Sequence, residues 1–331
     1  INGVYISTIG KKGNGPGEYK AINNLYIHDD NIYVQSFYDL NIYNRNGSFI
    51  KKHNNRFLIN NEYISSWFLM DDSLFLGKIN RMSGKEKQKA LIFDINGNIK
   101  ESYKNHIYLH RLKPLAGSDE SEASIFRFHN TVYFKERCND TLFYLTKDYQ
   151  LKPLYNFDFG RYAQQFLQGE EDLQGYVSKL HNYIWMENVF QSSAYLFLDC
   201  NFNKYFPARR FTPKVIMDGI STDYNTTHVL GIYNRQTNDL IFCKPADTDN
   251  PLFTSGLFND IDAGPRFFPA KQVNDSTLVM WIDPGQLKEH VASDDFKNNI
   301  PKFPEKKKQL EELAGSISEY DNPVLMFVTF K

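Results

Sequence analysis

A unit of four short β-type segments recurs along the chain, and this recurrence constrains the fold more than any other feature. Within each unit, apolar and polar residues alternate, and short turns rich in Asn, Asp and Gly separate the segments. The first unit comprises residues 24–28, 31–35, 40–44 and 48–52. Repeated four-stranded meanders are typical of β-propeller blades, so the sequence predicts an all-β fold of this type.

Four further units follow the first. Their segments are 67–70, 73–77, 89–94 and 99–103; 124–128, 131–136, 141–146 and 151–157; 183–188, 194–200, 228–233 and 240–244; and 267–273, 276–282 and 323–330. The fourth unit contains a long connection at 201–227. A large β-sandwich is the alternative fold, but it does not explain why one turn recurs at the same place in each unit.

Few segments of the chain have helical character. Residues 162–180 carry apolar side chains near helical spacing, and 284–296 and 304–313 each have Pro near their start. The last two segments lie inside the fifth unit. They predict a helical surface insertion at about 284–314 in the last blade.

Composition excludes several classes of function. The formal net charge of −1 gives no field that would attract nucleic acid, so no nucleic-acid partner is predicted. The sequence has no apolar run long enough to span a bilayer. Cys138, Cys200 and Cys243 are far apart and form no CxxC pattern, which predicts reduced, mostly buried thiols and no zinc site.

A Gly-rich connector, Gly10-Lys11-Lys12-Gly13-Asn14-Gly15-Pro16-Gly17-Glu18, joins a β-type run at 4–9 to the first unit. It is not a phosphate loop, because neither a Lys-Ser/Thr pair nor a helical pattern follows its last Gly. Gly and Pro instead favour a tight turn. We expect Glu18 to accept backbone N–H bonds within this connector.

Together with this connector, four motifs resemble a known family. They are residues 132–142 (VYFKERCNDTL), 155–160 (YNFDFG), 258–265 (FNDIDAGP) and 321–325 (DNPVL). The chain resembles the six-bladed β-propeller lipoproteins of Bacteroides-type bacteria, a family of unknown function. The resemblance implies an exported, lipid-anchored protein of the periplasm or outer membrane, with the lipid anchor absent from this chain.

Two departures from the family pattern qualify the resemblance. Ala263 stands where a second Gly is usual, and only residues 4–9 of a first blade precede the connector. We therefore expect residues 1–331 to form a single propeller domain that lacks most of its first blade. Five full blades and the end of another would then be visible, with six in the complete protein. Closure of the fifth unit by residues 4–9, giving five blades, is the alternative.

Propeller geometry predicts where a site would lie. Strands A to D of each blade run outward from the axis, so D-to-A connections and B-to-C turns share one face. The connector and 250–266 are predicted D-to-A connections, and 35–38, 78–87, 136–140 and 187–190 are predicted B-to-C turns. The candidate ligand-binding residues on this face are Glu136, Arg137, Glu187, Asn259, Asp260, Asp262 and Arg266.

Each candidate also has a structural interpretation. Asp260 and Asp262 are candidate Ca²⁺ ligands, or they cap turns through their side chains. Otherwise no cofactor is predicted. Glu136 and Arg137 bind a carboxylate or sugar, or form an ion pair between neighbouring blades. Glu187, close to Trp185, is a candidate carbohydrate contact.

The sequence contains no HExxH or GxSxG motif, so the first functional hypothesis is a non-catalytic binding or interaction scaffold of the bacterial envelope. Such a scaffold would expose Phe37, Tyr38 and Phe190, and its partner would be a carbohydrate or an envelope protein. The alternative is an enzyme acting on a carbohydrate or lactone, with carboxylates and Ca²⁺ on the same face. A purely structural subunit of an envelope complex is the third hypothesis.

Overall fold

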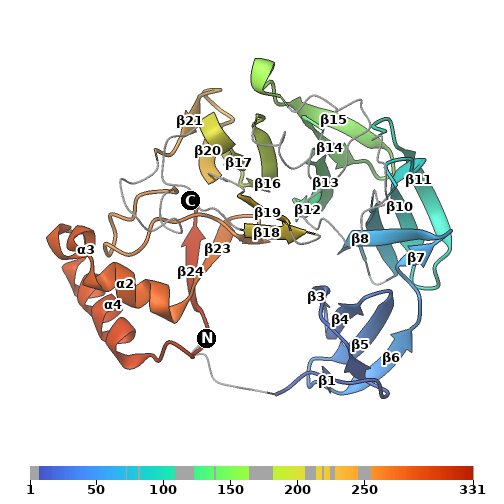
Figure 1. The fold of residues 1–331 in the computed structure, drawn as a ribbon, viewed down its shortest axis with the longest axis horizontal. Helices are drawn as coiled ribbons and strands as arrows, with labels where there is room; N and C mark the ends of the chain where they lie inside the picture. The colour runs from blue at the N-terminus through green and yellow to red at the C-terminus, as the bar shows by residue number, and fades with distance from the viewer. Residues whose placement is uncertain are drawn as a thin grey trace. The chain divides into compact units, whose positions relative to one another are not determined.

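Antiparallel strands dominate the computed structural model of the protein, and helices are few, which confirms the predicted all-β class (Figure 1). The structure describes residues 7–71, 73–80, 83–108, 123–137, 139–163, 182–205, 214–217, 220–223, 228–244 and 255–330. In these residues, five sheets of three to five strands follow one another along the chain.

The first sheet has the predicted four strands in the order β3-β4-β5-β6. They are β3 (Asn24–His28), β4 (Asn31–Ser36), β5 (Asp39–Asn44) and β6 (Phe49–His53). Before it, the short strands β1 (Lys11–Lys12) and β2 (Glu18–Tyr19) pair with each other across the Gly-rich connector. The predicted boundaries of the first unit are correct to within about one residue.

The second sheet contains one strand more than predicted. The four predicted segments are β8 (Glu62–Leu69), β9 (Leu74–Ile79), β10 (Gln88–Asp94) and β11 (Ile99–Lys104). A two-residue strand, β7 (Leu58–Ile59), pairs with the start of β8 and extends the sheet to five. Strand β8 also begins five residues before its prediction, because Ile64 and Trp67 are buried along it.

The third and fourth sheets each have four strands. They are β12 (Ala123–Phe128), β13 (Thr131–Glu136), β14 (Thr141–Leu145) and β15 (Leu151–Asn156), then β16 (Trp185–Gln191), β17 (Tyr195–Asn201), β20 (His228–Asn234) and β21 (Leu240–Phe242). The long connection before β20 contains a 3₁₀ turn, η3 (Asn203–Tyr205), and a hairpin of β18 (Lys214–Met217) and β19 (Ile220–Asp223). The predicted helix at 162–180 lies mostly outside the described residues. Its first residues end a 3₁₀ turn, η2 (Gly160–Tyr162).

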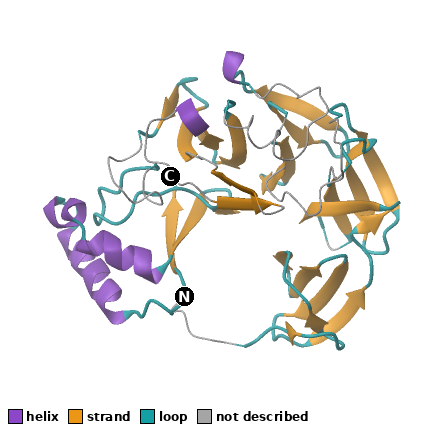
Figure 2. Ribbon diagram, in the orientation of Figure 1, coloured by secondary structure: helices purple, strands orange, loops and turns teal. Residues whose placement is uncertain are grey.

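The fifth sheet has three strands, β22 (Lys271–Asn274), β23 (Thr277–Ile282) and β24 (Val324–Thr329). Its helical insertion is observed as α2 (Pro284–Ala292), α3 (Asp294–Asn298) and α4 (Pro304–Ser316), drawn in purple in Figure 2. Leu287 and Ala314 of these helices are buried in the same core cluster as Leu278 and Met280 of the sheet. The insertion therefore packs on the fifth sheet.

In the first two sheets, the turn between the third and fourth strands is closed by the same kind of side-chain hydrogen bonds. The Oδ1 atom of Asn44 accepts hydrogen bonds from the backbone N–H of Asn46 and Ser48, at 3.0 and 2.9 Å. Asp94 makes the same pair of bonds in the second sheet, to Asn96 and Asn98. A short polar side chain that closes its own turn is the chemistry that favours Asn and Asp there.

Neighbouring sheets pack face to face within two compact units. One unit contains the first two sheets, and the other contains most of the third sheet and all of the fourth and fifth. The core clusters join the first sheet to the second, the third to the fourth, and the fourth to the fifth. This succession of small antiparallel sheets is the blade arrangement of a β-propeller. Within the described residues, no helix has the length and apolar character that a membrane crossing requires.

Candidate functional site

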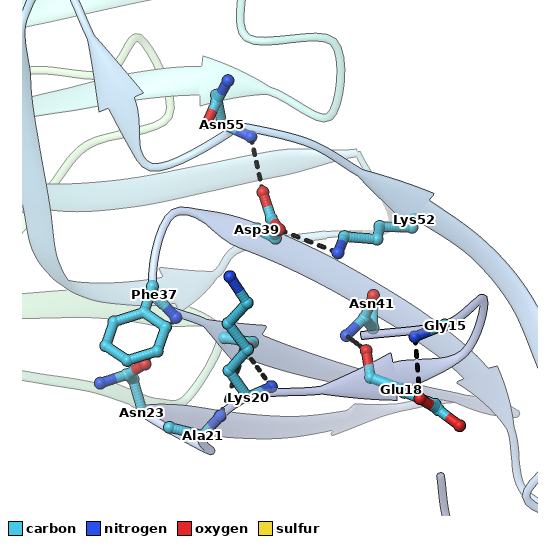
Figure 3. Close-up of polar contacts among 11 residues, drawn as sticks. Gly15, Glu18, Lys20, Ala21, Asn23, Phe37, Asp39, Asn41, Lys52 and Asn55 are labelled. Carbon is cyan, nitrogen blue, oxygen red and sulfur yellow. Dashed lines mark hydrogen bonds and ion pairs between the residues drawn. The ribbon is translucent and has the colours of Figure 1, made fainter. Parts of the chain in front are cut away.

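The side chain of Glu18 is bound by other residues of the Gly-rich connector. The Oε2 atom of Glu18 accepts a hydrogen bond from the backbone N–H of Gly15 at 2.8 Å (Figure 3). The Oε1 atom of Glu18 lies 3.1 Å from Lys11 Nζ. The backbone hydrogen bond, together with Lys11, holds the pKa of Glu18 below its usual value. The expected structural role of Glu18 is thus confirmed.

Glu187 is the extra residue of a β-bulge. In the pairing of β16 with β17, Met186 is opposite Cys200 and Asn188 is opposite Asp199, so Glu187 has no partner of its own. Bulges turn a side chain out of the regular alternation of a strand. The prediction that 187–190 form a B-to-C turn is therefore wrong. These residues lie inside β16, and the apolar Val189 and Phe190 are buried there.

Glu187, Arg137 and Trp185 form a compact arrangement between the third and fourth sheets. The Oε1 atom of Glu187 accepts a hydrogen bond from the Trp185 indole N–H and lies 3.2 Å from the Arg137 guanidinium. That guanidinium also lies over the Trp185 ring, 4.6 Å from its centre. The side chains of Arg137 and Glu187 are only 11% and 9% exposed. Arg137 therefore makes an ion pair between neighbouring sheets, with Glu187 as its partner.

Two more charged residues are buried at the end of β13. Lys135 and Glu136 are each 1% exposed. Lys135 Nζ donates a hydrogen bond to the backbone oxygen of Glu136 at 2.6 Å, and Asn139 Nδ2 donates to Glu136 Oε2 at 3.4 Å. In the same turn, burial raises the pKa of Asp140, although Lys135 opposes this effect. Burial of so many charges is costly unless they are paired, so the charged groups of this turn depend on their ion pairs and hydrogen bonds.

Asp199 and His228 form a dyad that the sequence analysis did not identify. Asp199 Oδ1 lies 2.7 Å from His228 Nδ1, and Asn188 Nδ2 donates to Asp199 Oδ2 at 3.1 Å. Burial alone would lower the pKa of His228. The hydrogen bond and charge of Asp199, with the charge of Glu187, raise it above its usual value against the opposing charge of Arg137. A charged residue inside the apolar run of β17 was the available signal.

We call Lys135, Glu136, Arg137, Glu187, Asp199 and His228 the charged cluster. Its members come from the end of β13, the start of β16, the end of β17 and the start of β20. Within the fourth sheet, the antiparallel register places the start of β16, the end of β17 and the start of β20 at the same end of the sheet. The charged cluster also affects the thiol of Cys200. Burial, Asp199 and Glu187 raise the pKa of this thiol, and Lys135 opposes the effect.

The remaining candidates lie in the loop before the fifth sheet and act within it. Asn259 Oδ1 accepts from the N–H of Ile261 at 3.1 Å, and Asp262 Oδ1 accepts from the N–H of Gly264 at 2.8 Å. Asp260 Oδ2 lies 2.7 Å from Lys302 Nζ. These bonds agree with the turn-capping interpretation of Asp262, whereas Asp260 ties the loop to the residues before α4.

Arg266 belongs to the same loop, with its guanidinium 5.7 Å from the centre of the Phe258 ring. None of the hydrogen bonds, ion pairs or ring contacts of Asn259, Asp260, Asp262 or Arg266 reaches the charged cluster in the described residues. The same part of the chain holds no group of three or more His, Cys, Asp or Glu side chains placed to bind a metal ion.

The aromatic residues predicted to be exposed divide into two groups. Phe37 and Tyr38 are 48% and 44% exposed, as expected for a contact surface. Phe190 is 6% exposed and packs in the core between the fourth and fifth sheets, so its predicted exposure is wrong. Cys200 and Cys243 are free thiols, buried and partly buried respectively, and Cys138 lies outside the described residues.

Solved structures are similar to this chain at low sequence identity. A Bacteroides fragilis protein named as a candidate exported protein is 16% identical, with a TM-score of 0.61 over 98% of this chain and 81% of its own. A DUF4221 family member from Bacteroides vulgatus is 14% identical over 70% of this chain and 69% of its own, with a TM-score of 0.46. A virginiamycin B lyase from Staphylococcus aureus is 9% identical, with a TM-score of 0.34 over 69% of this chain and 71% of its own.

The last two scores are too low to support an argument about fold or activity. No curated protein matches the chain. At the level of families, one profile matches residues 1–329, nearly the whole sequence. The chain therefore belongs to the family described as the domain of unknown function DUF4934.

Proposed function

We propose that the protein is a non-catalytic binding scaffold of the bacterial envelope, and that its ligand binds at the charged cluster. The observation that carries this proposal is the buried arrangement of Arg137, Trp185 and Glu187 around a β-bulge. A regular strand would pack an apolar side chain there at lower cost, so a bulge that presents a carboxylate indicates a binding role. Rigid strand ends would hold the ligand-binding groups in place.

Thermal unfolding tests the position of this site. A ligand at 100 times its dissociation constant stabilises the folded state by about 2.7 kcal/mol. A panel of cell-envelope saccharides and peptides is screened with and without Ca²⁺. We expect one of these ligands to raise the Tm of the wild type. Glu187→Gln should abolish this shift. Asp260→Ala is the matched variant in the other predicted loop. A shift lost in Asp260→Ala but retained in Glu187→Gln would place the ligand at residues 259–266 instead.

The envelope location and the sixth blade belong to the same proposal. Export is supported by the name of the B. fragilis protein with the shared fold. A further blade is supported by the fifth sheet, where Trp281, Leu325 and Phe327 are each more than half exposed. In the complete lipoprotein, an additional sheet would cover this apolar face. Fractionation of cells that make the complete protein should recover it with the outer membrane, and recovery in the cytosol would contradict the location.

One observation favours a second function, an enzyme acting on a sugar or lactone. A carboxylate that holds one nitrogen of a His leaves the other nitrogen able to take up a proton, as in many hydrolytic sites. Asp199 and His228 have this relationship. A panel of glycosides and lactones, tested with the wild-type chain and His228→Gln, would reveal turnover that depends on His228. Absence of any such turnover favours the scaffold.

A further inference from the structure

Two hydrogen-bond acceptors in the charged cluster lack a partner among the described residues. The Oε2 atom of Glu187 is buried and accepts no hydrogen bond, although the side chain is more than nine-tenths buried. The Nε2 atom of His228 makes no hydrogen bond either, because its contact with Asp199 uses Nδ1. A buried carboxylate oxygen without a donor is costly. A ligand that supplies a donor would remove that cost.

Two donors face the same oxygen of the Glu187 carboxylate. Its Oε1 atom lies against both the Trp185 N–H and the Arg137 guanidinium. Only one of its two oxygens is used in this way. The other oxygen keeps its full capacity to accept a strong hydrogen bond from a ligand.

When His228 is neutral, the described residues around Glu187 carry an excess of negative charge. In the described residues of the charged cluster, the carboxylates of Glu136, Glu187 and Asp199 accompany the fixed cations of Lys135 and Arg137, with His228 as the titrating member. Above its raised pKa the His228 ring is neutral, and with the Nδ1–H group donating to Asp199 Oδ1 its Nε2 atom is an acceptor. At such a pH the cluster presents acceptors and an unbalanced negative charge to a ligand.

We propose that the charged cluster recognises a primary ammonium group, with Glu187 Oε2 and His228 Nε2 as its acceptors. This inference rests on the proposed function, because it assigns the ligand of the same site. An ammonium has three donors and no acceptor, so it satisfies acceptors without adding one. A neutral hydroxyl brings lone pairs of its own and no charge. An amino sugar and an alkyl diamine share the ammonium chemistry, and the experiment separates these two sources.

Isothermal titration calorimetry on the chain of residues 1–331 tests this proposal with three probes. Glucosamine and glucose differ by one ammonium group, and cadaverine carries the ammonium without a sugar. We expect glucosamine or cadaverine to bind and glucose not to bind. Binding of glucosamine alone assigns an amino sugar, and binding of both assigns the amine as such. Glu187→Gln should weaken binding by about tenfold or more, since it removes a charged hydrogen bond.

Two variants keep the test independent of folding. His228→Gln changes a half-exposed residue, and at a pH above the folded pKa of His228 we expect it to weaken ammonium binding several-fold while the Tm stays close to that of the wild type. Glu312→Gln, on the exposed face of α4, should leave binding unchanged. Equal binding of glucose and glucosamine, lost in Glu187→Gln, would overturn the ammonium assignment but keep the site. Failure of both amines to bind overturns the inference, whereas the proposed function fails only when the Tm panel also gives no ligand.

Discussion

Gly17 shows how a single residue limits the connector. Its φ of +70° lies in the left-handed region, and a Cβ atom placed there would lie 2.8 Å from the Cβ of Phe49. Its backbone oxygen also accepts the Tyr43 hydroxyl at 3.1 Å. A turn that must meet both conditions requires Gly. The neighbouring Gly13 differs, because the nearest atoms to its added Cβ belong to the flexible end of Glu18.

We predict that Gly17→Ala destabilises the protein by about 1–3 kcal/mol, because it adds left-handed strain and a contact that is too close. Urea unfolding measures the change. Gly285→Ala is the matched control, since Gly285 has open space around it in the first turn of α2 and should lose no stability. Equal stability of Gly17→Ala and the wild type would show that the connector can rearrange.

At the scale of elements, the ion pair of Arg137 with Glu187 joins the end of β13 to β16. We predict that Arg137→Met destabilises the chain by about 3 kcal/mol, because it leaves the buried carboxylate of Glu187 without its charged partner. Lys308→Met is the control, since Lys308 pairs with Glu312 on the exposed surface of α4 and should change stability by less than about 0.5 kcal/mol. Urea midpoints of both variants test this, and similar losses would contradict it.

The pairing of β17 with β20 predicts a dependence of stability on pH. The pKa of His228 is raised in the folded protein, so His228 contributes stability that is fully present below its unfolded pKa of about 6.5. This contribution is lost as the pH rises through the folded pKa. His228→Gln should remove that part of the pH profile. Tm measured against pH decides the matter, and parallel profiles for wild type and His228→Gln would refute the assignment.

At the scale of the whole molecule, the fifth sheet has an apolar face on the side opposite its packed face. In the register, Trp281 is opposite Leu325 and Val279 is opposite Phe327. The alternate residues Leu278 and Met280 are in the core. Trp281, Leu325 and Phe327 are 54–56% exposed. A contiguous apolar face of this kind usually contacts another surface.

We predict that the double variant Trp281→Thr, Phe327→Thr changes the stability of the chain of residues 1–331 by less than about 1 kcal/mol, because both side chains are already half exposed. The same variant in a chain that includes a covering blade should lose several kcal/mol, as for large side chains removed from a core. Chemical unfolding of both chains compares the two cases. A similar small loss in both would argue against a covering blade.

Much of the fold could be predicted because local chemistry repeats. Alternation of side chains and the Asn and Asp turns fix each meander, and Pro284 and Pro304 mark the helices that interrupt the fifth. The site was harder to predict. Arg137 and Glu187 were identified as charged residues near strand ends, but their pairing depends on how two sheets pack. Asp199 and His228 are 29 residues apart, and the charge of Asp199 inside an apolar strand does not identify its partner. The β-bulge at Glu187 depends on register, which the residues of one strand alone do not determine.

The β-bulge also allows the site to change in evolution without a change in the scaffold. Removal of Glu187 alone would leave Met186 opposite Cys200 and Asn188 opposite Asp199 as consecutive pairs of a regular ladder. The buried faces on both sides of the position would keep their neighbours. A single-codon insertion or deletion could therefore create or erase this carboxylate in related chains without repacking their interiors. Recognition could diverge within such a lineage faster than its architecture.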